Sequence, residues 1–182
     1  MKNIVFDLGG VLFARDKSKC TPELLEFFSF LRAPRMPLFW EDYDRGVSTL
    51  DEVTGILSGI NACPRAKCEE YLRLSIDMQE PVKPTEQLVR DLKAAGYKLY
   101  VLSNMSREFI DFLRRFPVYG LFDGEVVSCE EHTVKPEPRI YEILLERYGL
   151  TPSETLFIDD REMNIDAACD ALRRRLLQSD CI

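Results

Sequence analysis

Residues 2–12 read KNIVFDLGGVL, a short apolar run that stops at Asp7 and then turns through two glycines. A run of this length, bounded by a polar residue, is typical of a buried strand. Three later segments share this character: residues 98–102 before Ser103, 124–127 before Ser128, and 155–158 before Asp159. We therefore expect four buried strands, each followed directly by a polar side chain.

Helical patterns accompany these strands, at residues 86–95, 107–116, 139–148 and 164–172. Gly96 and Gly149 follow two of them, and glycine commonly marks the end of a helix. Strands that alternate with helices of this length need crossover connections, which favour a parallel sheet covered on both faces. The pattern therefore predicts an α/β fold.

Residues 14–82 interrupt the alternation and read as helical throughout. Thr21, and either Ser48 or Thr49, are suited to cap the N-termini of helices in this stretch. A helical block inserted just after the first strand indicates a lid or cap over the strand ends. We expect two domains: a catalytic core of residues 1–13 and 83–182, and a helical cap of residues 14–82.

The composition argues against several classes of function. The formal net charge is −7, whereas binding to a nucleic-acid backbone needs a basic face. The six cysteines form no CxxC pair and the chain has one histidine, so a zinc cluster is not expected. No stretch is apolar enough for a membrane span, and the first residues do not read as a signal peptide. We expect a cytoplasmic protein with reduced thiols and no membrane partner.

The polar residues that follow the strands form one candidate site. In open α/β sheets, ligands bind outside the carboxyl ends of the strands. Asp7, Ser103 and the pair Asp159–Asp160 fall at such ends, and Lys135 lies in a loop after the third strand. A carboxylate can act as a nucleophile toward a phosphoryl group, and carboxylate and carbonyl oxygens suit Mg²⁺. A hydroxyl and an ammonium can hold the phosphoryl oxygens, so the set predicts phosphoryl transfer.

Four motifs in order resemble those of the haloacid dehalogenase-like (HAD) hydrolase superfamily. They are FDLGGVL at residues 6–12, VLSN at 101–104, KPEP at 135–138 and FIDDREMN at 157–164. The resemblance spans nearly the whole chain and implies a Rossmann-like core with a helical cap between the first and second motifs. Within the superfamily, the sequence is similar to the helical-cap (subfamily I) phosphatase branch, in which glucose-1-phosphate-type phosphatases also carry Asp-Leu-Gly in the first motif.

The resemblance implies how a metal ion would be held. Asp7 would be both the nucleophile and a ligand of Mg²⁺, and Gly9 would contribute its backbone carbonyl. Asp160 would bind Mg²⁺ directly or through water. Asp159 and Asn164 would support Asp160.

The resemblance also implies how a substrate would be held. Ser103 and the backbone N–H of Asn104 would hold the transferring phosphoryl group, and Lys135 would bridge the phosphoryl oxygens and the nucleophile. The resulting hypothesis is a magnesium-dependent phosphatase that hydrolyses a small phosphorylated metabolite through an aspartyl-phosphate intermediate. A sugar phosphate is the first substrate to test.

One position departs from the family pattern. Most phosphatases of this superfamily have a second aspartate two residues after the nucleophile, where this chain has Gly9. That aspartate protonates the leaving oxygen and then activates water, a contribution of roughly 10²–10⁴-fold or about 3–5 kcal/mol. Asp16 and Asp159 are candidates to replace it. We expect the substrate pocket to be lined by Trp40, Tyr43 and Arg45. Trp40 is equally suited to the core of the cap.

Two alternatives remain open at this point. A 2-haloacid dehalogenase would use the same aspartate to attack carbon without a metal, but that branch shows Tyr-Gly-Thr where this chain has residues 9–11, Gly-Gly-Val. A catalytically impaired binding or regulatory protein is suggested by Gly9 and by the tail. Residues 169–182 lack the glycine turn and the apolar edge strand that relatives usually have, so either the last helix continues and the edge strand is absent, or this end of the sequence is abnormal.

Overall fold

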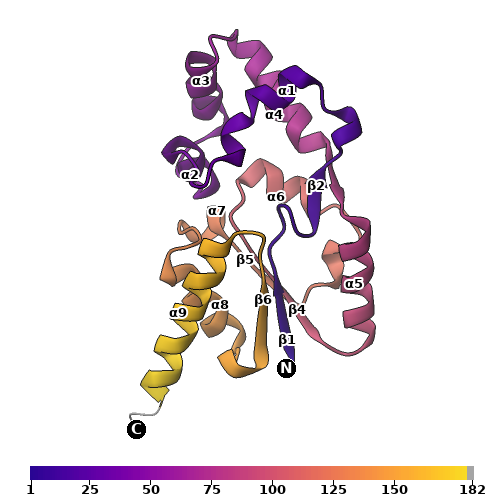
Figure 1. Cartoon of the computed structure of the whole chain (residues 1–182), viewed down its shortest axis with the longest axis vertical. Coiled ribbons are helices and arrows are strands. Elements are labelled where there is room, and N and C mark those ends of the chain that lie inside the picture. The colour runs from indigo at the N-terminus through magenta and orange to yellow at the C-terminus, as the bar shows by residue number, and fades with distance from the viewer. Residues whose placement is uncertain (180–182) are drawn as a thin grey trace.

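The computed structural model describes the backbone of residues 1–179 and the side chains of residues 1–171 other than Lys17. Its centre is a four-stranded parallel sheet with the order β5-β4-β1-β6 (Figure 1). The strands are β1 (Asn3–Phe6), β4 (Lys98–Ser103), β5 (Gly124–Val127) and β6 (Thr155–Ile158). The predicted α/β fold with a parallel sheet is confirmed. Phe6 pairs with Val101 on one side and with Ile158 on the other, so neighbouring strands end almost level.

Helices cover both faces of this sheet (Figure 1). Side chains of α5 (Lys83–Ala94) and α6 (Arg107–Leu113) pack on one face, and those of α8 (Pro138–Tyr148) and α9 (Glu162–Ser179) on the other. A single turn, α7 (Ser128–Glu131), directly follows β5. The side chains of each strand reach both of these helical layers, because successive side chains point to opposite faces of the sheet.

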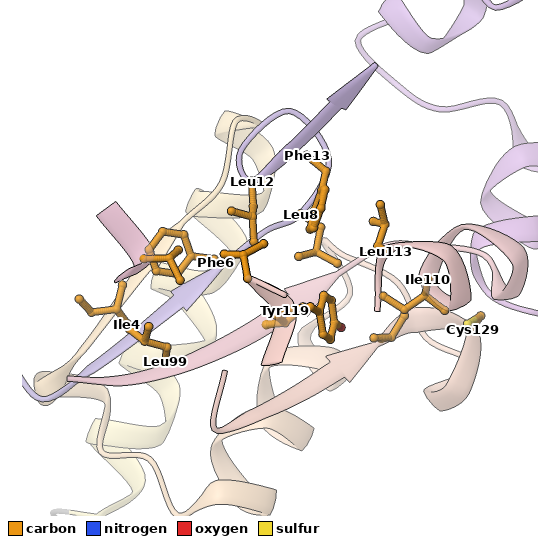
Figure 2. Close-up of a cluster of buried hydrophobic side chains, with 14 residues drawn as sticks. Ile4, Phe6, Leu8, Leu12, Phe13, Leu99, Ile110, Leu113, Tyr119 and Cys129 are labelled. Atoms are coloured by element: carbon orange, nitrogen blue, oxygen red, sulfur yellow. The ribbon is translucent and has the colours of Figure 1, made fainter. Parts of the chain in front are cut away.

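The loop that follows β1 is anchored by the core on one face of the sheet. Ile4 and Phe6 point to this face, whereas Val5 belongs to the cluster on the other. Figure 2 shows that the same cluster continues beyond the strand and onto α6, through Leu8, Leu12, Phe13, Ile110 and Leu113. Apolar packing therefore fixes the backbone on both sides of Asp7.

Four helices stand together beyond the carboxyl ends of the strands, at the top of Figure 1. They are α1 (Pro22–Phe27), α2 (Leu38–Asp44), α3 (Leu50–Ile60) and α4 (Arg65–Asp77), and we call them the insert. Two expected N-caps are confirmed: the Thr21 hydroxyl accepts the Leu24 N–H, and Thr49 forms a capping box with Glu52. The insert has its own core, in which Trp40 is buried among aromatic rings.

The prediction that residues 14–82 are helical throughout is wrong at both ends. Two short strands, β2 (Phe13–Arg15) and β3 (Gln79–Pro81), pair in antiparallel orientation where the chain enters and leaves the insert. The Asp16 N–H donates to the Met78 carbonyl (2.9 Å), which extends this ribbon toward the insert. Strands of three residues carry too little alternation to be recognised in a sequence.

The last described element is α9, which continues to Ser179. Of the two alternatives for this end of the sequence, the structure has the continued helix as far as Ser179. Cys181 lies outside the described residues. No strand follows β6 between residues 159 and 179, so β6 forms one edge of the sheet. Neither α9 nor any other described helix combines the length and apolar character needed to cross a membrane.

Candidate active site

Asp7 lies directly after β1 and lines a cavity of about 890 Å³. The core also contributes Gly9, Asn104, Lys135 and Asp160 to this cavity, and the insert contributes its opposite wall. The position agrees with the rule that open α/β sheets bind ligands outside the carboxyl ends of their strands. The structure thus brings the residues expected from the four motifs to one place.

The carboxylate of Asp7 is held through one of its two oxygens. Its Oδ1 accepts hydrogen bonds from the Ser103 hydroxyl (2.7 Å) and the Leu8 N–H (2.7 Å), and it lies 3.0 Å from Lys135 Nζ. Among the described residues, no such donor contacts Oδ2. Burial raises the pKa of Asp7, and the nearby Lys135 ammonium opposes that rise. The geometry therefore orients the carboxylate and leaves one oxygen available.

Lys135 is a buried ammonium with its acceptors in place. Its Nζ contacts Asp7, Asp159 Oδ2 (2.5 Å) and the Leu102 carbonyl (3.0 Å). The side chain is 1% exposed, so its charge depends on these partners. Asn104 positions the backbone of Lys135: its side chain accepts the Lys135 N–H (2.7 Å) and donates to the Lys135 carbonyl (2.8 Å). Sequence reasoning missed this role, because it considered only the backbone N–H of Asn104.

Asp159 is oriented by its own loop and by the first turn of α9. Besides Lys135, it accepts the Arg161 N–H (2.9 Å) and the Asn164 side-chain amide (2.9 Å). Its carboxylate is fully buried. These contacts suit a residue that links Lys135 to the start of α9, and they occupy both of its oxygens.

A divalent cation fits the charge of this site. One carboxylate oxygen from each of Asp7, Asp159 and Asp160 lies within 4.8 Å of the others. Three carboxylates outnumber the two nearby cations, the Lys135 ammonium and the Arg161 guanidinium, and burial together with the Asp159 charge raises the pKa of Asp160. The excess negative charge and the oxygen donors match the preferences of Mg²⁺. Because protein donors already occupy both oxygens of Asp159, Asp7 and Asp160 are the carboxylates that could bind a cation.

Gly10 leaves the space that Asp160 needs. Its φ is +77°, and a Cβ at this position would lie 2.4 Å from Asp160 Oδ2. We expect Gly10→Ala to lower the free energy of unfolding by about 1–2 kcal/mol through its left-handed backbone. The same change should also displace the Asp160 carboxylate and weaken Mg²⁺ binding. Urea unfolding and calorimetric Mg²⁺ titration measure the two effects separately.

Gly96 provides the matched control for that prediction. Its φ is +86°, and nothing lies within 4 Å of the Cβ that alanine would add. Gly96→Ala should therefore carry a similar backbone cost and bind Mg²⁺ normally. Unchanged Mg²⁺ affinity in Gly10→Ala would contradict the expectation that Asp160 binds the ion.

The structure does not bring every expected residue to the cavity. Asp16 accepts hydrogen bonds from the Ser18 N–H and hydroxyl and does not line the cavity. Tyr43 and Arg45 are also absent from its lining, because their side chains turn to the core and contact Glu108 and Glu137. The expectation that these two line the pocket is therefore wrong.

Four residues of α2 line the cavity, namely Leu38, Trp40, Glu41 and Asp44. Trp40 lies both in the cavity wall and in the hydrophobic core of the insert, the two positions expected for it. Asp44, the last residue of α2, also lines the cavity, and sequence reasoning missed it. An acidic residue at a helix end looks like any solvated one, so no signal in the sequence could have marked it.

Comparison with known proteins places the chain in a family. A family model described as haloacid dehalogenase-like hydrolase matches residues 1–171, so the protein belongs to the HAD-like hydrolases. The chain is 28% identical over 168 residues to a sesquiterpene phosphatase of Aspergillus oryzae, covering 92% of this chain and 84% of the relative. It is 25% identical over 182 residues to a D-ribitol-5-phosphate phosphatase of Bacteroides thetaiotaomicron, covering 91% and 85%.

Solved structures show the same fold. A HAD family enzyme of Bacteroides thetaiotaomicron, in complex with magnesium and inorganic phosphate, matches with a TM-score of 0.72 at 25% identity, covering 94% of this chain and 91% of that one. A dehalogenase with an intermediate complex matches with a TM-score of 0.75 at 18% identity, covering 94% and 81%. The fold is thus common to a HAD family enzyme that holds magnesium and phosphate and to a dehalogenase, so the fold alone does not distinguish between activities.

Proposed function

We propose that this protein is a magnesium-dependent phosphatase that hydrolyses a small phosphorylated metabolite through an aspartyl-phosphate on Asp7. The observation that carries the proposal is the oriented Asp7 carboxylate, held by Ser103 and Lys135 beside the free carboxylate of Asp160. The phosphatase names of two relatives support it, as does the magnesium and phosphate held by a neighbouring structure.

In this proposal Mg²⁺ would be held by the carboxylates of Asp7 and Asp160 and by the backbone carbonyl of Gly9. Gly9 lines the cavity beside both carboxylates. When bound, Mg²⁺ supplies positive charge that stabilises the phosphoryl oxygens in the transition state.

The residues of the chain divide the remaining work. Oδ2 of Asp7 attacks phosphorus, while Oδ1 stays fixed by the Leu8 N–H. The Lys135 ammonium and the Ser103 hydroxyl hold the phosphoryl oxygens together with the Asn104 backbone N–H. Because these donors are preorganised and buried, they act on the developing charge in a low-dielectric environment.

The insert is proposed to act as a cap on this site. It is joined to the core by the β2–β3 ribbon, and it supplies one wall of the cavity. A cover of this kind excludes water from the reacting groups and orients the part of the substrate that does not react.

The lining of the cavity favours a substrate with an apolar organic part. Large apolar side chains line the space on the insert side and in and just before α6, namely Leu31, Met36, Leu38, Trp40, Met105 and Phe109. Arg15 and Arg35 add positive charge suited to a phosphate ester. The similarity to a sesquiterpene phosphatase points in the same direction. An isoprenoid phosphate is therefore a stronger candidate than the sugar phosphate first expected.

The proposal predicts phosphate release that depends on Mg²⁺. The panel consists of farnesyl phosphate, glucose 1-phosphate, an aryl phosphate and 2-chloropropionate, each assayed with Mg²⁺ and with EDTA. We expect phosphate release only with Mg²⁺, and a higher kcat/KM for farnesyl phosphate than for the sugar phosphate. Chloride release without metal would instead support the dehalogenase alternative. Mg²⁺ binding with no turnover of any compound would support a non-catalytic protein.

A further inference from the structure

The general acid and base that Gly9 does not provide has a candidate on the insert. We infer that Asp44 donates a proton to the leaving oxygen and later accepts one from water. This inference rests on the proposed phosphatase function and adds a catalytic residue to it. It assigns part of the chemistry to a residue outside the four motifs.

One of the acidic side chains around the cavity remains as a candidate for the general acid and base. Among the described residues, the acidic side chains that line it are Asp7, Glu41, Asp44 and Asp160. Asp7 is the proposed nucleophile and Asp160 a proposed metal ligand. Glu41 is ion-paired with Arg45 at 2.8 Å. Asp44 has no such ion pair among the described residues, and it shares the cavity with the nucleophile.

Contacts on both sides fix Asp44 against the core. The Tyr43 hydroxyl donates to Glu108 of α6 (2.7 Å), and the Arg45 guanidinium makes a two-point contact with Glu137 at the start of α8 (2.7 and 2.9 Å). The Asp44 carbonyl itself accepts a hydrogen bond from the Ser128 hydroxyl at the start of α7, which lies next to α2 in Figure 1. Three successive residues thus dock the end of α2 onto the core, at the edge of the cavity that Asp44 lines.

The backbone after Asp44 is equally close to the core. Gly46 has a φ of +74°, and a Cβ there would lie 2.5 Å from the Cys129 carbonyl oxygen. Only glycine allows this approach without a shift of the chain. A catalytic group must be held within a fraction of an ångström of its productive position, and this docking supplies such support.

The surroundings of Asp44 favour the protonated form that an acid needs. Its side chain is partly open to the cavity, but the protein around it removes most of its water, and this burial raises its pKa to about 7. The Asp7 and Glu41 charges act in the same direction, whereas the Ser106 backbone and the Arg161 guanidinium oppose it. The remaining charged groups near this end of α2, Arg45, Glu108 and Glu137, are engaged with partners. A general acid works best with a pKa close to the operating pH.

The proposed steps are balanced as follows. Oδ2 of Asp7 bonds to phosphorus while the bond from phosphorus to the ester oxygen breaks, and that oxygen takes the proton of the Asp44 carboxyl. The Asp44 carboxylate then accepts a proton from a water whose oxygen attacks phosphorus. The bond between phosphorus and Asp7 breaks, which releases phosphate and restores the Asp7 carboxylate and the protonated Asp44.

Asp44→Asn tests this role through the leaving group. The kcat/KM value reports the steps up to departure of the leaving group, which needs a proton for an alkyl phosphate and little help for an aryl phosphate. We expect Asp44→Asn to lower kcat/KM for the alkyl ester farnesyl phosphate by roughly 10²–10⁴-fold, and for 4-nitrophenyl phosphate by much less. The control is Asp42→Asn, which makes the same change on the same helix away from the cavity lining. It should match the wild type with both esters.

A second variant restores an acid at the usual place. Gly9 has no positive φ, and the Cβ of a substituted residue would meet only Met105 Cε at 4.0 Å, so aspartate can be accommodated. Gly9→Asp in the Asp44→Asn background should recover farnesyl phosphate turnover. Equal losses for the two esters in Asp44→Asn, or no recovery in the double variant, would overturn the inference while leaving the phosphatase function intact. A wild type inactive on both esters would instead remove the phosphatase proposal itself.

Discussion

Asp7→Asn is expected to lower kcat for phosphate release by roughly 10⁴-fold or more, because an amide cannot replace a carboxylate nucleophile. The change is isosteric, and its carbonyl oxygen can still accept from Ser103 and Leu8. Because burial raises the pKa of Asp7, the native state already disfavours the charged form at this position. The variant should therefore fold at least as stably as the wild type. Phosphate release and thermal unfolding measure the two properties on the same sample.

The contrast between activity and stability makes this prediction specific. Asp77→Asn, on the exposed end of α4, is the control and should change neither property. An Asp7→Asn variant that keeps most of its turnover would contradict the role of Asp7. A variant that loses activity together with a large part of its stability would show only that the fold had been damaged.

Lys135→Met is expected to have the largest effect on stability. It removes the only ammonium that contacts the Asp7 and Asp159 carboxylates among the described residues, while keeping an apolar stem beside the Phe157 ring. Two buried carboxylates are then left without their cation, a change that costs about 3–5 kcal/mol. Phosphate release should fall as well, because the phosphoryl oxygens lose a donor. Urea unfolding in EDTA gives the stability without any contribution from bound metal.

Two further measurements separate charge from packing in Lys135→Met. Loss of the ammonium raises the pKa of the buried Asp7 further, so the native state of the variant binds protons more readily than the unfolded chain. Its stability deficit should accordingly shrink as the pH falls toward the ordinary pKa of an aspartate and grow as the pH rises. Lys67→Met, at an exposed ion pair with Glu70, should cost at most about 1 kcal/mol. A deficit that did not change with pH would contradict the electrostatic account.

The sheet and its candidate site were predictable from the sequence because the site residues lie at the ends of the strands that define the fold. Strand residues such as Val5 and Val101 must be apolar to lie between two helical layers, and the abrupt change at Asp7 and Ser103 marks where the sheet meets the cavity. Parallel strands that end level then bring distant motifs together without further information. The lysine at 135 could be placed in the site for the same reason.

The insert was predictable only as a helical block. Its packing depends on contacts between residues far apart in the sequence, such as Arg45 with Glu137 and Tyr43 with Glu108. Nothing local distinguishes an arginine that docks α2 onto the core from one that faces solvent. For the same reason the sequence placed Tyr43 and Arg45 in the pocket, whereas the structure places Asp44 there.

Trapping the phosphoryl group on Asp7 is the most direct test of the central claim. The enzyme is mixed with substrate and Mg²⁺, quenched within one turnover and treated with borohydride, which reduces an aspartyl-phosphate to homoserine but leaves a free carboxylate unchanged. Peptide mass spectrometry should find homoserine at position 7 in the wild type, and none with EDTA or in Asp7→Asn. Mg²⁺-dependent phosphate release with an unmodified Asp7 at every quench time would contradict an aspartyl-phosphate mechanism.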